Sequence, residues 1–379
     1  MTQFLSQFKR IKSCDMVLFF CVFLLVMIGL IMIFSTMSIV GQSQFDDGFF
    51  FIKRQFVFLS IGGLGLLTGL LIPHQLYKKY ALYGYFLGVF LLIMTLIPGV
   101  GVKVGGAQRW IDSGFLLFQP IELVKFFLAV FFATAISNKQ AEIHLFTKGL
   151  VPILGLSLFP VFLLMMQPDL GNSVLIFFVM LSVLFLANVN LKHFFSLLSA
   201  LLSIVSISVL LHPYQLARIK SFLNPWKDPL GKNYHIIQSF TAIGSGGLLG
   251  LGFGQSKLKF FYLPLHYSDF IFAIICEEGG LVLAILVLLL FAGILVRAVK
   301  NGLACQDDFS FYLSLGLSLF LVFQALINMA VAVGVFPITG IPLTFISYGG
   351  TSLVCSLFFV GVLLNISQTP VQAIEELSL

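Results

Sequence analysis

Ten runs of about 18 or more apolar residues divide this 379-residue chain, and each could cross ~30 Å of hydrocarbon as a helix. Charged residues make up only 9% of the chain, whereas roughly a quarter is typical of soluble domains. Backbone in contact with lipid must satisfy its own hydrogen bonds, which a helix does locally. We therefore expect an all-α polytopic membrane protein. Its spans are predicted near 16–38, 55–72, 81–98, 120–137, 147–166, 170–188, 193–211, 270–296, 310–335 and 351–367.

The spans leave no room for a soluble domain, so residues 1–379 are expected to form one integral membrane domain. A long outer loop, 212–268, separates the seventh and eighth spans. Loops of this length are usually functional or disordered, and its aromatic and aliphatic content argues against disorder. The first apolar run follows basic residues, as in a signal peptide, but it is too long and no clear cleavage site follows. It is interpreted as a retained span.

The distribution of Lys and Arg predicts that both termini face the cytoplasm, because short cytoplasmic connections carry the excess of positive charge. Lys53, Arg54, Arg109 and Lys125 are exceptions, since they stand in or beside short outer connections. Either this orientation is inverted or these cations have a function on the outer side.

Glu122 and Lys125 lie three residues apart, on one face of a helix that starts near Pro120. A charge inside a membrane helix costs about 3 kcal/mol on insertion scales, so such residues normally face the bundle interior and pair. Two interpretations remain open: a packing ion pair, or a Lys125 that binds an anion while Glu122 orients it. Arg54, at the outer end of the second span, would face the same vestibule.

Two aspartates stand at predicted helix starts on the outer side. Asp169 lies in the short turn QPDL, where an N-cap alone would explain it. Asp269 stands before the eighth span, about two helical turns ahead of Glu277 and Glu278. An N-cap is an alternative here too, but outer cations and the long loop converge on the same face. A partly desolvated carboxylate in such a place can serve as a general base.

Other signals are weak. The stretch GSGGLLGLGFG (Gly244–Gly254) matches neither a dinucleotide fingerprint nor a P-loop, so glycines for tight turns are the simpler interpretation. Five scattered cysteines form no C-x-x-C pair, and six histidines show no metal-ligand spacing. The basic residues of the outer loop suit an anionic lipid headgroup better than nucleic acid.

Several longer stretches, in order, resemble the SEDS proteins (shape, elongation, division and sporulation). The matching stretches are KRQ (Lys53–Gln55), GGAQRWI (Gly105–Ile111), FQPIELVK (Phe118–Lys125), QPDLGNS (Gln167–Ser173), RIKSFLNPWKDPLGKNYHIIQS (Arg218–Ser239), AIGSGGLLG (Ala242–Gly250), SDFIFAIICEEGG (Ser268–Gly280) and FPITGIPLTFISYGGTSL (Phe336–Leu353).

The resemblance implies a ten-helix peptidoglycan glycosyltransferase of the cytoplasmic membrane, which polymerises lipid II at the outer face beside a class B penicillin-binding protein. It implies that Asp269 is catalytic. The expected substrate-binding residues are Lys53, Arg54, Arg109, Trp110, Glu122, Lys125, Asp169 and Arg218. No cofactor is certain, although a divalent cation, Mg²⁺ or Mn²⁺, could share the charge. Lipid II, the nascent glycan strand and other division proteins are the expected partners, and nucleic acid is not.

One departure concerns the approach to Asp269. The family usually reads P-E-A-H-T-D, whereas this chain reads Pro264-Leu265-His266-Tyr267-Ser268-Asp269. Asp269 keeps its place, but any role of the missing Glu and the displaced His is in doubt. LNPW (Leu223–Trp226), GQSKLKFFYLP (Gly254–Pro264) and VFPITGIPL (Val335–Leu343) look closer to the division branch, FtsW, than to the elongation branch, RodA. A lipid II flippase and a non-catalytic scaffold are the competing functions.

Overall fold

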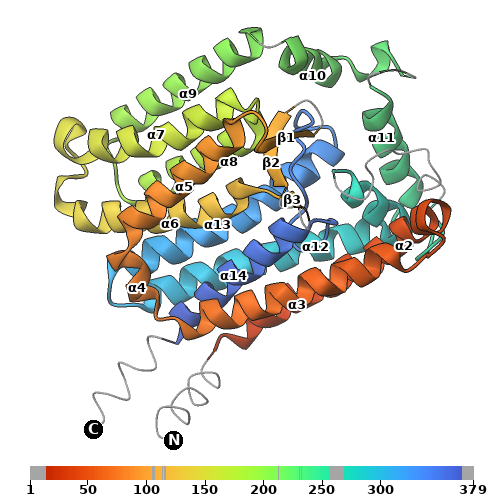
Figure 1. The fold of residues 1–379 in the computed structure, drawn as a ribbon, viewed down its shortest axis with the longest axis horizontal. Helices are drawn as coiled ribbons and strands as arrows, with labels where there is room; N and C mark the ends of the chain where they lie inside the picture. Colours follow the sequence, from red (N-terminus) through yellow and green to blue (C-terminus); the bar gives the residue numbers. More distant parts are fainter. Residues whose placement is uncertain are drawn as a thin grey trace, which may run out of the picture.

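The structure, a computed structural model, describes residues 14–104, 107–112, 114, 117–211, 213–229, 231, 233–256 and 269–368. All ten predicted spans are helices (Figure 1). They are α2 (Met16–Phe45), α3 (Phe50–Leu71), α5 (Ala81–Leu96), α6 (Pro120–Asn138), α7 (Val151–Met166), α8 (Leu170–Leu186), α9 (Leu191–Leu211), α12 (Ile271–Ala304), α13 (Asp308–Ala332) and α14 (Gly350–Ser367).

Seven helices in the described part of the chain are long and apolar enough to cross a membrane, and α5, α8 and α9 add shorter apolar helices. Shorter elements connect the spans. They are α4 (His74–Lys79), α10 (Pro213–Leu223), α11 (Tyr234–Gly246), two 3₁₀ turns, η1 (Gln140–Glu142) and η3 (Pro225–Lys227), and a π-helical turn, η2 (Phe146–Leu150). The chain is a multi-pass membrane protein, as predicted.

A small antiparallel sheet, which the sequence did not predict, lies between α5 and α6. Its strands are β1 (Gly101–Val104), β2 (Ala107–Asp112) and β3 (Leu117–Phe118), in the order β1-β2-β3. Val102 pairs with Trp110, and Ile111 pairs with Phe118. The strands are too short for their alternation to stand out from the surrounding apolar spans.

Aspartates set the starts of three helices. Asp15 accepts from the backbone N–H groups of Val17 and Leu18, both at 3.1 Å, and Asp307 accepts from Ser310 N at 3.1 Å. Asp169 caps α8 in the same way, as its position in the sequence predicted. A carboxylate at a helix start satisfies amides that have no partner within the helix.

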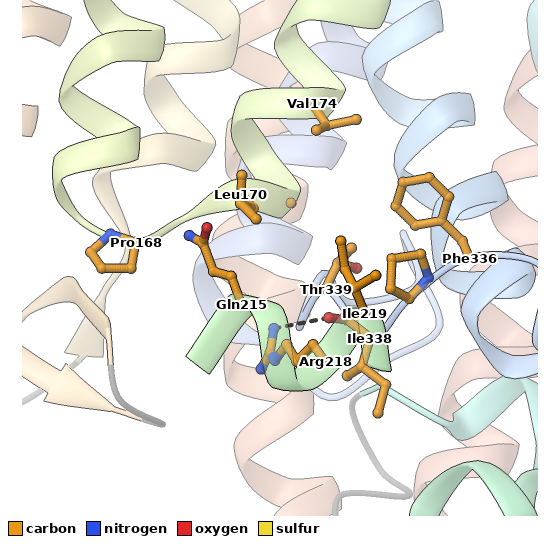
Figure 2. A pocket seen from close by; sticks show the side chains of 11 residues that line it. Pro168, Leu170, Val174, Gln215, Arg218, Ile219, Phe336, Ile338 and Thr339 are labelled. Carbon is orange, nitrogen blue, oxygen red and sulfur yellow. Dashed lines mark hydrogen bonds between the residues drawn. The ribbon is translucent and has the colours of Figure 1, made fainter. Parts of the chain in front are cut away.

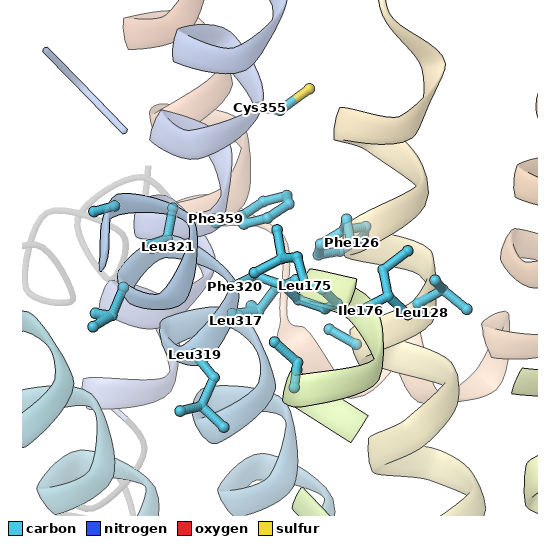
Figure 3. Packing of buried hydrophobic residues seen from close by; sticks show 14 of the residues in the cluster. Phe126, Leu128, Leu175, Ile176, Leu317, Leu319, Phe320, Leu321, Cys355 and Phe359 are labelled. Carbon is cyan, nitrogen blue, oxygen red and sulfur yellow. The ribbon is translucent and has the colours of Figure 1, made fainter. Parts of the chain in front are cut away.

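The core lies where α13 packs against α6, α8, α12 and α14. Figure 3 shows Phe126, Leu175, Phe320 and Phe359, from four of these helices, packed together. The α3–α14 contact depends on small residues, as expected for membrane helices. A Cβ at Gly69 would lie 2.7 Å from Phe358 O, whereas one at Gly65 would meet only ordinary contacts. Of these two glycines, Gly69 is therefore the one that the packing requires.

The glycine-rich stretch after α11 packs against an interruption of α12. Gly280 has φ 65° and breaks the helix, and the freed backbone bonds to the glycine turn. Leu251 N donates to Glu277 O at 2.9 Å, and Leu281 N donates to Gly247 O at 3.0 Å. The stretch makes tight turns, with positive φ at Gly247, Gly250 and Gly252, as the sequence suggested. The five cysteines form no disulfide with one another.

Candidate active site

The segment that joins α13 to α14, residues 333–349, is non-helical, and we call it the 333–349 segment. It is buried or half-buried except at Val333 and Val335. Non-helical backbone inside a membrane protein persists only where other groups satisfy its hydrogen bonds. Three side chains donate to its carbonyl oxygens: Arg218 Nη1 to Ile338 O at 2.9 Å, Asn328 Nδ2 to Ile341 O at 2.8 Å, and Gln324 Nε2 to Pro342 O at 3.3 Å.

Asp269 and Arg109 meet at Gly340 of this segment. A Cβ placed on Gly340 would lie 3.7 Å from Arg109 Nη1 and 3.9 Å from Asp269 Oδ2. The carboxylate, from just before α12, and the guanidinium, from β2, therefore lie near the same point. Asp269 is not the N-cap of α12, because Phe270 occupies that position. The alternative that Asp269 is the N-cap of α12 is therefore wrong.

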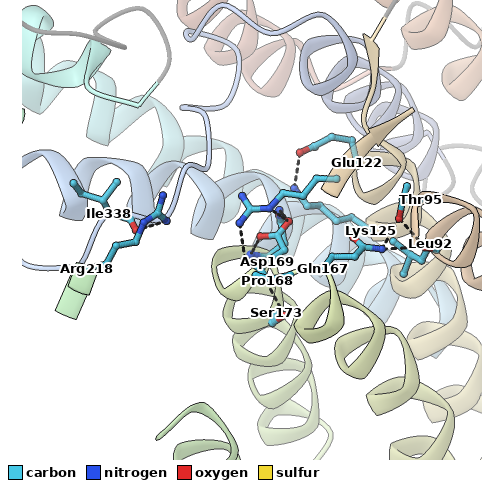
Figure 4. A network of polar contacts seen from close by, with 12 residues as sticks. Leu92, Thr95, Glu122, Lys125, Gln167, Pro168, Asp169, Ser173, Arg218 and Ile338 are labelled. Atoms are coloured by element: carbon cyan, nitrogen blue, oxygen red, sulfur yellow. Dashed lines mark hydrogen bonds and ion pairs between the residues drawn. The ribbon is translucent and has the colours of Figure 1, made fainter. Parts of the chain in front are cut away.

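Arg109 is also held by the turn before α8, where Figure 4 labels Pro168 and Asp169. Its Nη2 donates to Pro168 O at 2.7 Å, and its Nε lies 3.5 Å from Asp169 Oδ2. Asp169 Oδ2 accepts in addition from Asn172 Nδ2 at 2.8 Å. Asp169 thus combines two roles, an N-cap and a counter-ion that orients Arg109 toward Gly340.

The Glu122–Lys125 pair is buried, with side chains 3% and 1% exposed. Lys125 Nζ lies 2.9 Å from Glu122 Oε1, as the spacing predicted, and 2.6 Å from Gln324 Oε1. Gln324 also donates to Ser352 Oγ at 3.2 Å. The ammonium therefore sits in a polar cluster that joins α6, α13 and α14.

Arg218 borders a small apolar cavity of about 90 Å³ beside the 333–349 segment (Figure 2). Its other walls come from the start of α8 and from α10, with Leu170, Val174 and Phe336 among the lining residues. A cation at the rim of an apolar pocket suits a ligand that joins an anionic group to a hydrocarbon chain.

The remaining predicted residues have contacts of their own. Lys53 is exposed and pairs with Asp47 at 2.7 Å, and its hydrogen bond holds the pKa of the Asp47 carboxyl below the usual value. Arg54 is exposed, with its guanidinium 5.9 Å from the centre of the Phe58 ring. Trp110 is half-buried on β2, next to Arg109.

Glu277 and Glu278 are both only 1% exposed. Ser35 Oγ donates to Glu278 Oε1 at 2.7 Å, and Ser256 Oγ donates to Glu277 Oε2. These carboxylates lie within α12, where the backbone of the same two residues accepts hydrogen bonds from the glycine-rich stretch.

A divalent cation finds no ready ligand set: in the described ranges, no group of three or more His, Cys, Asp or Glu side chains could hold a metal ion. His266, Tyr267 and the lysines Lys232, Lys257 and Lys259 lie outside the described residues.

Sequence reasoning missed Gln324, Asn328 and Gly340. The first two are polar residues one helical turn apart in an apolar span, which is a recognisable sign of an internal polar cluster. Nothing local marks Gly340, because its importance comes from residues far away in the sequence.

Known proteins resemble this chain over nearly its whole length. The family model described as cell cycle protein, covering FtsW, RodA and SpoVE, matches residues 15–371. Stage V sporulation protein E of Bacillus subtilis is 41% identical over 357 residues, which are 94% of this chain and 97% of that protein. A protein of Trichlorobacter lovleyi named probable peptidoglycan glycosyltransferase FtsW is 39% identical and covers 97% of this chain and 96% of its own length.

Solved structures agree. A chain of a peptidoglycan synthase complex that coordinates polymerization and crosslinking superposes with a TM-score of 0.79 at 29% identity, over 95% of this chain and 99% of that one. The rod shape determining protein RodA of Thermus thermophilus has a TM-score of 0.69 at 27% identity, over 93% and 96%. This chain belongs to the FtsW/RodA/SpoVE family, the SEDS proteins that the sequence motifs indicated.

Proposed function

We propose that this protein is a peptidoglycan glycosyltransferase that polymerises lipid II into glycan strands at the outer face of the cytoplasmic membrane. Relatives bearing the name probable peptidoglycan glycosyltransferase FtsW, which align over about the whole chain, support this activity. The convergence of Asp269 and Arg109 on Gly340 is the observation that carries it.

In this reaction Asp269 accepts the proton of the GlcNAc 4-hydroxyl of the acceptor lipid II. The freed oxygen forms a bond to the anomeric carbon of the donor strand, with inversion. The bond from that carbon to the diphosphate oxygen breaks, and undecaprenyl diphosphate leaves with the electron pair. Positioned cations can stabilise the charge that grows on the diphosphate, which is the main electrostatic demand of the step. We assign this role to Arg109, Lys125 and Arg218, supplemented by Arg54.

We propose that four further residues help to bind the substrate or to orient these cations. They are Lys53, Trp110, Glu122 and Asp169. A requirement for Mg²⁺ or Mn²⁺ stays a prediction, which addition of a chelator to the polymerisation assay tests. We place the site outside and both termini in the cytoplasm, since the charged connections favour that orientation.

A class B penicillin-binding protein is the proposed partner, because a similar chain was solved in a synthase complex that couples polymerization to crosslinking. We assign the protein to cell division, on the strength of its FtsW-like motifs and of its relatives named FtsW. An elongation role, as in RodA, is the alternative.

A lipid II flippase is the second candidate function. It is favoured by the ionisable residues buried inside the bundle, Lys125, Glu277 and Glu278, because such residues often mark a transport pathway. The clustering of the site residues around one non-helical segment favours chemistry instead.

Reconstitution in vesicles separates the two functions. Purified protein, alone and with its penicillin-binding partner, is mixed with lipid II, and both glycan polymer and transbilayer movement of lipid II are measured. Polymer formed by the wild type and lost in Asp269→Ala supports the proposal. Movement of lipid II without polymer contradicts it.

A further inference from the structure

Two side-chain amides of α13 form hydrogen bonds with residues that carry the charged groups of the site. Gln324 and Asn328 are 3% and 1% exposed, and they lie four residues apart, one helical turn, on the same face. Neither belongs to the charged residues that the sequence motifs single out.

Asn328 fixes the backbone that carries the proposed base. Its Nδ2 donates to Asp269 O at 3.1 Å and to Ile341 O at 2.8 Å. One amide group thus ties the start of α12 to the residue that follows Gly340. The distance between the Asp269 carboxylate and the Gly340 backbone depends on this bridge.

Gln324 ties the buried cation, Lys125, to the 333–349 segment in a similar way. Its Oε1 accepts from Lys125 Nζ at 2.6 Å, and its Nε2 donates to Pro342 O at 3.3 Å, the residue after Ile341. The bond from Lys125 requires the oxygen on one side and thereby fixes which end of the amide faces the 333–349 segment.

We propose that Gln324 and Asn328 are positioning residues, which set Lys125 and Asp269 at fixed places relative to the 333–349 segment. The proposal rests on the glycosyltransferase function above and divides the labour: Asn328 positions the base, and Gln324 positions a cation for the diphosphate. Neither residue is proposed to touch the reacting atoms.

The division predicts different kinetic signatures. Displacing the base weakens only the transition state, so it lowers kcat at an unchanged KM. Displacing a cation that binds the diphosphate of the substrate and also stabilises its growing charge raises KM and lowers kcat. A merely structural role would instead lower activity in proportion to the fraction of folded protein.

Thr344 supplies the matched control. Its Oγ1 donates to Leu321 O at 3.0 Å, so it is a third buried donor between the same segment and α13, but it does not take part in either bridge. Asn328→Leu and Gln324→Met each remove a whole amide, with its donor and its acceptor, and Thr344→Val removes one hydroxyl. Each substitution keeps a similar side-chain shape.

The experiment measures lipid II polymerisation by the four purified proteins, after size-exclusion chromatography confirms that each is folded. Asn328→Leu is expected to lower kcat at least about tenfold, and Gln324→Met to raise KM at least about fivefold, with Thr344→Val within about twofold of wild type in both. Parallel losses in all three variants, or none in Asn328→Leu and Gln324→Met, would overturn the positioning roles while the wild type still polymerises. A wild type that makes no polymer would refute the proposed function itself.

Discussion

The Asp269 carboxylate and the Arg109 guanidinium come within 4 Å of the same point, the position that a Cβ on Gly340 would take, from residues 160 positions apart in the sequence. A methyl group at residue 340 would lie in contact with both groups. We expect the bare backbone of Gly340 to leave room there for the acceptor hydroxyl.

Gly340→Ala tests this relationship. The residue has φ 76°, so alanine adds backbone strain of about 1–2 kcal/mol, and its methyl group also lies within 4 Å of both charged groups. Gly99→Ala is the control, because Gly99 has φ 88° and a Cβ there meets nothing within 4 Å among the described residues. Both variants should lose similar thermal stability, and only Gly340→Ala should lose most polymerisation. Equal activity in the two would show that the space at residue 340 has no function.

The buried Glu122–Lys125 pair is tested with a double variant. Lys125→Met leaves an uncompensated carboxylate in the core and should cost about 3–5 kcal/mol of stability. Adding Glu122→Gln removes that charge, so the double variant should recover much of the lost thermal stability but remain inactive. If the double variant polymerised lipid II normally, Lys125 would be only half of a packing pair.

The contact between α11 and α12 makes an opposite prediction for two neighbouring glycines. A Cβ on Gly246 would overlap the carbonyl oxygen of Cys276, whereas one on Gly244 meets nothing within 4 Å in the described part of the chain. Gly246→Ala should destabilise by about 1–3 kcal/mol. Gly244→Ala should be neutral or stabilise by up to about 1 kcal/mol, since alanine favours helix. Thermal unfolding in detergent measures both, and the same sign for both would contradict the packing.

His74, in the connection between α3 and α5, predicts a dependence of stability on pH. Its Nδ1 lies 2.8 Å from Asn365 Oδ1 and its Nε2 lies 2.7 Å from Ser310 Oγ. Burial lowers the pKa of His74, against smaller upward effects of Asn365 and Asp307. The unfolded chain therefore binds a proton at His74 more readily than the folded chain does. The stability contributed by neutral His74 is present above about pH 6.5 and is lost as the pH falls below that value.

The measurement compares unfolding temperatures at pH 7.5 and pH 5.5. The wild type should lose stability on acidification, and His74→Gln, which keeps hydrogen-bonding groups but cannot titrate, should lose less. Burial also lowers the pKa of His235, so part of the loss of stability on acidification should persist in His74→Gln. An identical acid response in the two proteins would exclude His74 as its source.

The spans could be predicted because lipid imposes one requirement, about twenty apolar residues, on every crossing segment. The Glu122–Lys125 pair and the Asp169 cap were predictable for a similar reason, since both depend on spacing within one helix. The β1–β3 sheet and the 333–349 segment were not, because tertiary contacts stabilise them. Gln324 bonds to Lys125 across 199 residues, and no local pattern encodes such a distance.

For Asp269 too, the sequence predicted the local position but not the tertiary contacts. Its motif placed it at the mouth of α12, but only the fold shows that Phe270 is the cap and that Arg109 is the cation across Gly340. Lys53 was expected in the substrate site, and the structure gives it Asp47 as its partner. Exposed cations in short loops have many possible partners, and their sequence position does not choose among them.

The central claim is that Asp269 removes the acceptor proton, and Asp269→Asn tests it most directly because the substitution keeps the shape and removes the base. Polymerisation of lipid II by the purified variant is compared with the wild type and with Asp47→Asn, a control aspartate that pairs with exposed Lys53. The account predicts no glycan polymer from Asp269→Asn at a normal elution profile, with Asp47→Asn close to wild type. Polymer at the wild-type rate from Asp269→Asn would contradict it.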